Sequence, residues 1–149
     1  MRTRLIALAG AIWLTVVGVG AAYAADAPAG KPQTTCPVTG KAIDPKTSPH
    51  VDWEGQRVYV ADKAAGDAFR KDPETFFAKI AKDGVALQNV QTTCPVSGEK
   101  LEGGDMGEPV SVAYKGRTVR FCCSMCPPKF AKDPAKYLAT LPGEQGKAK

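Results

Sequence analysis

The sequence has little of what most enzyme active sites require. Its 149 residues include one histidine, His50, which removes most schemes of histidine acid–base catalysis. No glycine-rich phosphate loop, serine–histidine–aspartate set or paired-carboxylate motif stands out. We therefore do not expect an enzyme, and we interpret His50 as a residue of a surface loop.

The chain also lacks a strong excess of charge. Lysine and arginine number 20 against 15 acidic residues, and the basic residues are spread along the sequence. A nucleic-acid groove needs a concentrated basic patch, usually interleaved with aromatic residues. We therefore expect no nucleic-acid partner.

A long uncharged stretch lies at the N-terminus. Arg2 and Arg4 precede a run from 5 to 25 without a charged side chain, and Ala-Tyr-Ala at 22–24 matches signal-peptidase sites. We interpret residues 1–24 as a secretory signal peptide, which predicts a periplasmic or secreted protein with no membrane attachment after cleavage. The alternative is an uncleaved membrane anchor, because a spanning helix needs roughly 20 residues.

The rest of the chain is an imperfect repeat. "QTTCPVTG" at 33–40 and "QTTCPVSG" at 91–98 are identical at seven of eight positions. "VDWEGQRV" at 51–58 aligns with "VAYKGRTV" at 112–119, and "FRKDPETFF" at 69–77 aligns with "FAKDPAKYL" at 130–138. The repeat predicts two tandem copies, at 33–82 and 91–141. A linker at 25–32 and a tail at 142–149 are expected to be flexible.

Both copies predict the same order of elements. Each Cys-Pro-Val-[Thr/Ser]-Gly segment is a turn, and the segments 50–60 and 110–121 are hairpins around a glycine. Short helices are expected near 62–71 and 124–132. Asp-Pro pairs at 72–73 and 133–134 predict second helices, since aspartate caps a helix and proline suits its first turn. The expected fold class is therefore α+β, with two small copies in tandem.

Five cysteines lie beyond the predicted signal peptide: Cys36, Cys94, Cys122, Cys123 and Cys126. The alignment places Ala61, Asp62 and Ala65 of the first copy opposite the last three of them. Only the second copy therefore carries the cysteine cluster, and we interpret the first copy as a packing partner.

The cluster is expected at the N-terminus of a helix. Pro127 and Pro128 are tolerated only in a first helical turn. The partial positive charge there stabilises thiolates, which are both metal ligands and nucleophiles. Cys94, in its turn at the start of the same copy, would supply a further sulfur.

The cysteine spacing predicts a site for a soft metal ion. Three thiolates from Cys94, Cys122 and Cys126 suit Cu(I). Zn(II) would need a fourth donor, because Ser97 stands where a Cys-x-x-Cys turn has its second cysteine. The candidates for that fourth donor are Cys123, Cys36, His50 and water, and Met125 and Met106 offer soft thioethers.

Other interpretations of the cluster remain. Cys123 and Cys126 have the Cys-x-x-Cys spacing of a redox pair, although such pairs usually belong to a βαβ unit. A disulfide framework is a second alternative, which the odd cysteine count and the adjacent Cys122 and Cys123 disfavour. A c-type haem site is excluded, because Pro127 follows Cys126 in place of histidine.

The second copy resembles the YHS and TRASH families of heavy-metal-associated domains. The resemblance covers 94–138 and rests on "CPVSG", "YKG", "FCCSMC" and "FAKDPAKYL"; the first copy matches the same frame over 36–77 without the helix-start cysteines. It implies a treble-clef-like, metal-binding fold used in sensing, trafficking or resistance to copper and related metals, with a metal-transport protein or metalloprotein as partner. Carried over, the ligands would be Cys94, Cys122 and Cys126. Ser97 and the additional Cys123 depart from the family pattern.

Overall fold

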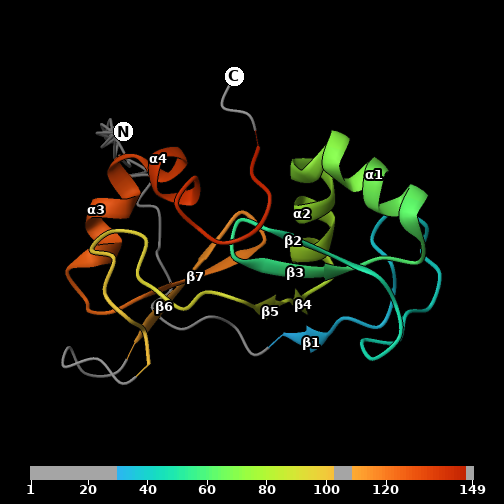
Figure 1. The fold of residues 1–149 in the computed structure, drawn as a ribbon, viewed down its shortest axis with the longest axis horizontal. Helices are drawn as coiled ribbons and strands as arrows, with labels where there is room; N and C mark the ends of the chain where they lie inside the picture. The colour runs from blue at the N-terminus through green and yellow to red at the C-terminus, as the bar shows by residue number, and fades with distance from the viewer. Residues whose placement is uncertain (1–29, 103–108, 147–149) are drawn as a thin grey trace, which may run out of the picture.

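The computed structural model describes residues 30–102 and 109–146, so the predicted signal peptide at 1–24 and Met106 lie outside the described residues. Within that part the fold is α+β, with four helices and three small sheets (Figure 1). The elements are β1 (Lys31–Pro32), β2 (His50–Trp53), β3 (Gln56–Tyr59), α1 (Lys63–Lys71), α2 (Pro73–Lys82), β4 (Val85–Ala86), β5 (Gln88–Asn89), β6 (Val110–Tyr114), β7 (Arg117–Phe121), α3 (Cys126–Lys132) and α4 (Pro134–Leu138). None of the helices in the described ranges has the length and apolar character needed to cross a membrane.

Two antiparallel hairpins form where the sequence predicts them. In the first, Trp53 of β2 faces Gln56 of β3, and in the second, Tyr114 of β6 faces Arg117 of β7. Each turn has two residues with positive φ: Glu54 at 45° and Gly55 at 78° in the first, Lys115 at 45° and Gly116 at 79° in the second. A two-residue turn with left-handed backbone at both central positions has a twist that matches that of the paired strands.

The helices begin at the predicted capping residues. The Asp72 carboxylate accepts a hydrogen bond from the Thr75 N–H at 3.3 Å at the start of α2. Asp133 accepts one from the Lys136 N–H at 3.2 Å at the start of α4. These bonds satisfy N–H groups that a helix N-terminus leaves free, which confirms the two Asp-Pro starts.

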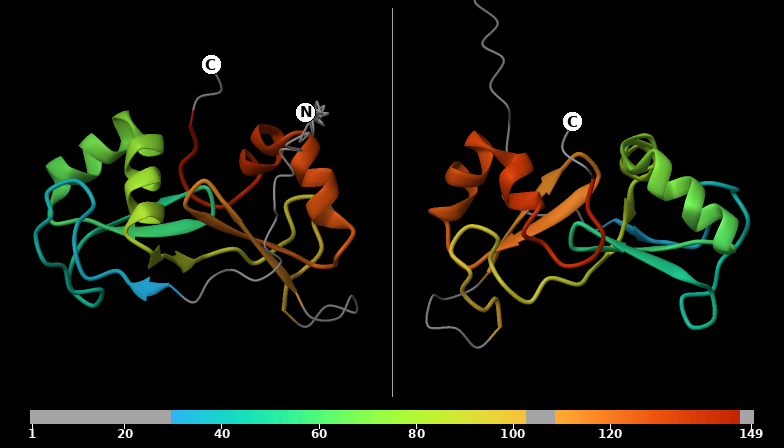
Figure 2. Two further views of the ribbon diagram at one scale, coloured as in Figure 1. Left: turned by 180° about the vertical axis from the view of Figure 1, so that it is seen from behind. Right: turned by 45° about the horizontal axis from the view of Figure 1, so that its top comes forward.

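Each hairpin packs against the two helices that follow it. Figure 2 shows α1 and α2 at one end of the molecule and α3 and α4 at the other, with the hairpins between them. The first core contains Val51, Trp53, Val58, Phe69, Phe77 and Ile80. The second contains Cys94, Leu101, Val112, Val119, Phe121, Cys122, Cys126, Phe130, Leu138 and Leu141. The cysteine cluster is therefore part of the second core.

In each half a glutamine side chain forms two hydrogen bonds to the backbone of one residue in the hairpin; we call this contact a glutamine clip. The Gln33 side chain donates to the Tyr59 carbonyl at 2.7 Å and accepts from the Tyr59 N–H at 2.9 Å. The Gln91 side chain donates to the Arg120 carbonyl at 3.2 Å and accepts from the Arg120 N–H at 2.9 Å. Each glutamine stands at the first position of the repeated "QTTCPV" segment, so it ties the cysteine turn to the neighbouring strand.

The hairpins contact each other through the residue that follows each turn glycine. Gln56 is fully buried, and its side chain donates to the Thr118 carbonyl of β7 at 2.8 Å. Arg117 is also buried; its guanidinium lies 2.6 Å from the Glu54 carboxylate, 2.5 Å from that of Glu74, and 3.9 Å from the centre of the Phe77 ring. The two halves are thus joined by buried polar side chains that find hydrogen-bond or ion-pair partners in the other half.

The C-terminal segment 142–146 differs from the flexible tail that its composition predicts. Glu144 donates its N–H to the Asp52 carbonyl at 2.7 Å and accepts from the Glu54 N–H at 3.0 Å. Gly143, at φ 97°, permits this approach, because a Cβ there would lie 2.5 Å from the Asp52 carbonyl oxygen. At the other end, Lys31 and Pro32 of the predicted linker form β1, which pairs with β4 in parallel.

Candidate metal centre

Three buried sulfur atoms meet at one point in the second half of the protein. The Sγ atoms of Cys94, Cys122 and Cys126 all lie within 4.8 Å of one another, and those of Cys122 and Cys126 are 3.8 Å apart. Two thiolates on one tetrahedral ion, with metal–sulfur bonds of about 2.3 Å, have their sulfurs about 3.8 Å apart. The Cys122–Cys126 spacing therefore matches that of two thiolates on one ion, and Cys94 lies close enough to be a third ligand.

Three different local structures deliver these sulfurs. Cys94 lies in a tight turn, in which its carbonyl accepts from the Gly98 N–H at 2.8 Å and its N–H donates to the Glu99 carbonyl at 2.7 Å. Cys122 directly follows β7. Cys126 is the first residue of α3, and the two prolines after it lie in the first helical turn, as predicted. A turn, a strand end and a helix start thus converge, and local sequence fixes each of them.

Ser97 contributes a hydroxyl to the same place. Its Oγ atom lies 3.2 Å from the Sγ atom of Cys122. The sequence identified Ser97 only as the position of a missing cysteine ligand. In the structure the Ser97 hydroxyl is within hydrogen-bond distance of the Cys122 sulfur and also interacts with Cys94, so a polar group that is not a thiolate lies beside the three sulfurs.

The electrostatics of the cluster favour a negative charge on Cys94. Burial by itself raises the pKa of this thiol, but hydrogen bonds from the Ser97 hydroxyl and from the N–H groups of Cys122, Ser97 and Val96 outweigh it and lower the pKa to about 7. Burial and the neighbouring thiols raise the pKa of Cys126. The Ser97 hydroxyl lowers the pKa of Cys122, yet burial and the Cys94 sulfur oppose it and the net shift is upward. A cation would therefore have to displace the remaining two protons.

Cys123 lies beside this group but not inside it. Its Sγ atom is 3.5 Å from that of Cys126, and its side chain is half-buried where the other three are buried. A hydrogen bond with Cys126 and one from the Met125 backbone lower the pKa of Cys123. The structure thus places all four predicted sulfurs together, three around one point and the fourth at its edge.

The other candidate donors lie elsewhere. Cys36 is buried in a separate cluster with Val60 and Ala65. His50 is exposed at the start of β2 and packs edge-on against Tyr59. Met125 is 68% exposed at the start of α3. Neither Cys36 nor His50 belongs to the three-sulfur group. Of the four predicted candidates for a fourth donor, Cys123 and water therefore remain, and Cys123 lies beside Cys126.

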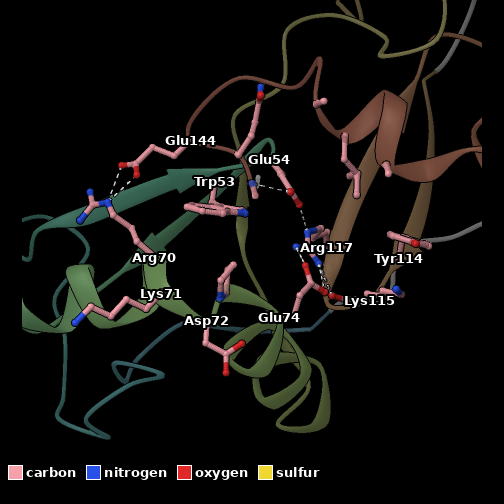
Figure 3. A pocket seen from close by; sticks show the side chains of 16 residues that line it. Trp53, Glu54, Arg70, Lys71, Asp72, Glu74, Tyr114, Lys115, Arg117 and Glu144 are labelled. Atoms are coloured by element: carbon pink, nitrogen blue, oxygen red, sulfur yellow. Dashed lines mark hydrogen bonds and ion pairs between the residues drawn. The ribbon is translucent and has the colours of Figure 1, made fainter. Parts of the chain in front are cut away.

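A cleft is lined by residues of both halves of the protein, and the sequence patterns did not indicate it. This cleft has a volume of about 900 Å³ and carries charged and aromatic side chains but no cysteine (Figure 3). Its charges largely pair within the protein: Arg117 lies between Glu54 and Glu74, and Arg70 pairs with Glu144 at 2.7 Å. We interpret these pairs as contacts that hold the two halves together.

The cysteines form no disulfide, so all five are free thiols. The Cys123–Cys126 pair is close enough for redox chemistry, and the group of Cys94, Cys122 and Cys126 could hold a metal ion. Comparison with known proteins adds nothing to this choice, because no family model, curated protein or solved structure matches the chain.

Proposed function

We propose that this protein is an exported metal-binding protein that holds one soft ion between Cys94, Cys122 and Cys126. The observation that carries the proposal is the gathering of three buried sulfurs within 4.8 Å of one another. Hydrophobic packing alone does not require thiols at three facing positions. The first copy has no such cluster; Ala61 and Ala65 align with Cys122 and Cys126, and Cys36 packs among apolar residues there.

Cu(I) is the ion that the donor set favours. Three thiolates satisfy a soft monovalent ion at low coordination number, whereas Zn(II) in a structural site almost always has four ligands. The Ser97 hydroxyl lies next to the Cys122 sulfur and is a poor ligand for a soft ion. Zn(II) is the second choice and would recruit Cys123 or a water molecule.

The tandem arrangement gives each half a separate task. We propose two treble-clef-like copies of the YHS or TRASH type, the first degenerate. The matching hairpin turns and the two glutamine clips support common ancestry of the copies. The first copy packs against the hairpin of the second through Gln56 and Arg117, so it acts as a scaffold for the sulfur site.

A binding protein of this kind serves metal trafficking, sensing or resistance, and not catalysis. The predicted signal peptide places it in the periplasm or outside the cell, where a metal transporter or a metalloprotein would be its partner. Soft ions in such a compartment require a thiol cluster that stays reduced. Burial of all three sulfurs shields them from oxidants and disulfides in solvent.

A competition titration tests the proposal. Reduced protein is titrated with Cu(I) and with Zn(II) against a chromophoric chelator, and wild type is compared with Cys94→Ser, Cys122→Ser and Cys126→Ser. Loss of a ligand should weaken Cu(I) binding by more than about 100-fold, or about 2.7 kcal/mol. Cys36→Ser is the matched control and should retain the wild-type affinity. Equal affinities in all five proteins would contradict the proposal.

Thiol–disulfide exchange is the second candidate function. It is favoured by the 3.5 Å distance between the Cys123 and Cys126 sulfurs and by the lowered pKa of Cys123. It predicts that the protein accelerates reduction of a disulfide substrate by a dithiol, and that Cys123→Ser and Cys126→Ser both abolish this effect. Absence of turnover in the wild type removes the candidate.

A further inference from the structure

Cys123 differs from the other three sulfurs in its access to solvent. Cys94, Cys122 and Cys126 are 1%, 2% and 4% exposed, whereas Cys123 is only half-buried. Its Sγ atom nevertheless lies 3.5 Å from that of Cys126, closer than the 3.8 Å between Cys122 and Cys126. Cys126 therefore has two buried sulfur neighbours, Cys94 and Cys122, and a third neighbour, Cys123, that is more exposed to solvent.

The helix start gives no structural reason for a cysteine at this position. Asp62, which aligns with Cys123 in the first copy, caps α1 by accepting a hydrogen bond from the Ala65 N–H at 2.8 Å. The start of α3 has no side-chain cap. The second copy thus has a thiol at the position aligned with a capping carboxylate of the first, whereas the N-cap of α3 itself is Met125.

From this arrangement we propose that Cys123 is an exchange ligand, through which the ion passes between the buried sulfurs and a partner protein that offers thiolates. The inference rests on the proposed function. It adds the route by which the ion leaves the buried sulfurs and the kind of protein that accepts the ion. Met125 lies two residues further on and is 68% exposed, so the surface beside Cys123 presents an apolar thioether to that partner. A soft, sulfur-rich acceptor fits this surface.

The transfer is a series of ligand substitutions without change in oxidation state. Cys123 loses its proton to solvent and bonds to the ion while the bond to Cys94 breaks; Cys126 remains bound, since it contacts sulfur on both sides. A partner thiolate then replaces Cys122, and a second one replaces Cys126 and Cys123. Each released sulfur takes up a proton. The first two stages each form one metal–sulfur bond and break one, and the last stage forms one and breaks two, so the ion leaves bound to two partner thiolates.

The test separates the rate of transfer from the affinity. Full-length reduced protein is loaded with one equivalent of Cu(I) and mixed with a peptide that contains a Cys-x-x-Cys motif, and transfer is followed by stopped flow. Cys123→Ser should bind Cu(I) within about three-fold of the wild-type affinity yet release it at least about 10-fold more slowly. Ser124→Ala, an exposed neighbour without sulfur, is the matched control and should transfer at the wild-type rate.

The outcomes are distinguishable. An unchanged transfer rate in Cys123→Ser overturns this inference alone. A loss of affinity as large as that of Cys122→Ser also overturns it, because Cys123 would then be a resident ligand. Wild-type protein that takes up no Cu(I) overturns the proposed function, and the inference with it.

Discussion

The hydroxyl oxygen of Ser97 lies 3.2 Å from the sulfur of Cys122. This contact brings an oxygen beside the three-sulfur group, from the sequence position at which a Cys-x-x-Cys turn would have its second cysteine. The hydroxyl is not a fourth thiolate, so residue 97 is the position at which a substitution can change the number of sulfurs near the cluster.

Ser97→Cys should convert the site to four thiolates. Because Zn(II) favours a closed tetrahedral set, its affinity should rise by about 100-fold or more, while Cu(I) affinity should change much less. Ser97→Ala is the control, and it should not improve Zn(II) binding. Competition titration measures both ions. Zn(II) affinity that stays at the wild-type value in Ser97→Cys would show that residue 97 does not face the ion.

One thiol of the metal-free reduced protein should ionise near neutral pH. The hydrogen bonds to Cys94 lower its pKa to about 7. The thiolate should therefore be populated above pH 7 and lost as the pH falls through that value. Thiolate absorbance in the ultraviolet measures the titration. Cys94→Ser should remove the step near pH 7, and persistence of the step in this variant would assign it to another cysteine.

Arg117 should be a major contributor to stability, because its side chain is fully buried beside two carboxylates. Arg117→Met leaves Glu54, itself buried, without a counter-charge. The free energy of unfolding should fall by about 3–5 kcal/mol in urea denaturation. The double variant Glu54→Gln with Arg117→Met should recover part of this loss. A decrease below about 1 kcal/mol would mean that the ion pair does not join the halves.

Cys36 should matter for stability but not for metal binding. Its thiol is fully buried in an apolar cluster with Val60 and Ala65. Cys36→Ser places a more polar group against Val60 and Ala65, but Thr39 and nearby N–H groups can hydrogen-bond to it, so the free energy of unfolding should fall by about 1 kcal/mol. Cu(I) affinity should stay unchanged. A parallel loss of Cu(I) affinity would indicate that Cys36 reaches the site, contrary to the structure.

The local features of this fold could be predicted from sequence. A glycine between alternating apolar residues predicts each hairpin, and Asp-Pro predicts the starts of α2 and α4, because turn and cap chemistry depend on neighbouring residues. The expected helix near 124–132 is also present, although it begins at Cys126. The convergence of Cys94 with Cys122 and Cys126 was expected from the layout of small cysteine metal sites and from the family resemblance, and not from local rules.

The features that join distant segments could not be predicted in this way. Gln56 and Thr118 are 62 positions apart, and nothing near either residue indicates their contact. The docking of Glu144 on the first hairpin likewise joins segments about 90 positions apart, through backbone hydrogen bonds with Asp52 and Glu54 that no side-chain pattern indicates. The orientation of Ser97 toward Cys122 depends on the packing of the turn against β7, so its hydroxyl appeared in sequence only as a missing ligand.

X-ray absorption of the Cu(I)-loaded, reduced protein tests the central claim most directly, because it counts the donor atoms around the ion. We predict a first shell of sulfur alone, with about three atoms in the wild type and fewer in Cys122→Ser. A shell dominated by nitrogen or oxygen, or one that Cys122→Ser leaves unchanged, would contradict the three-sulfur site.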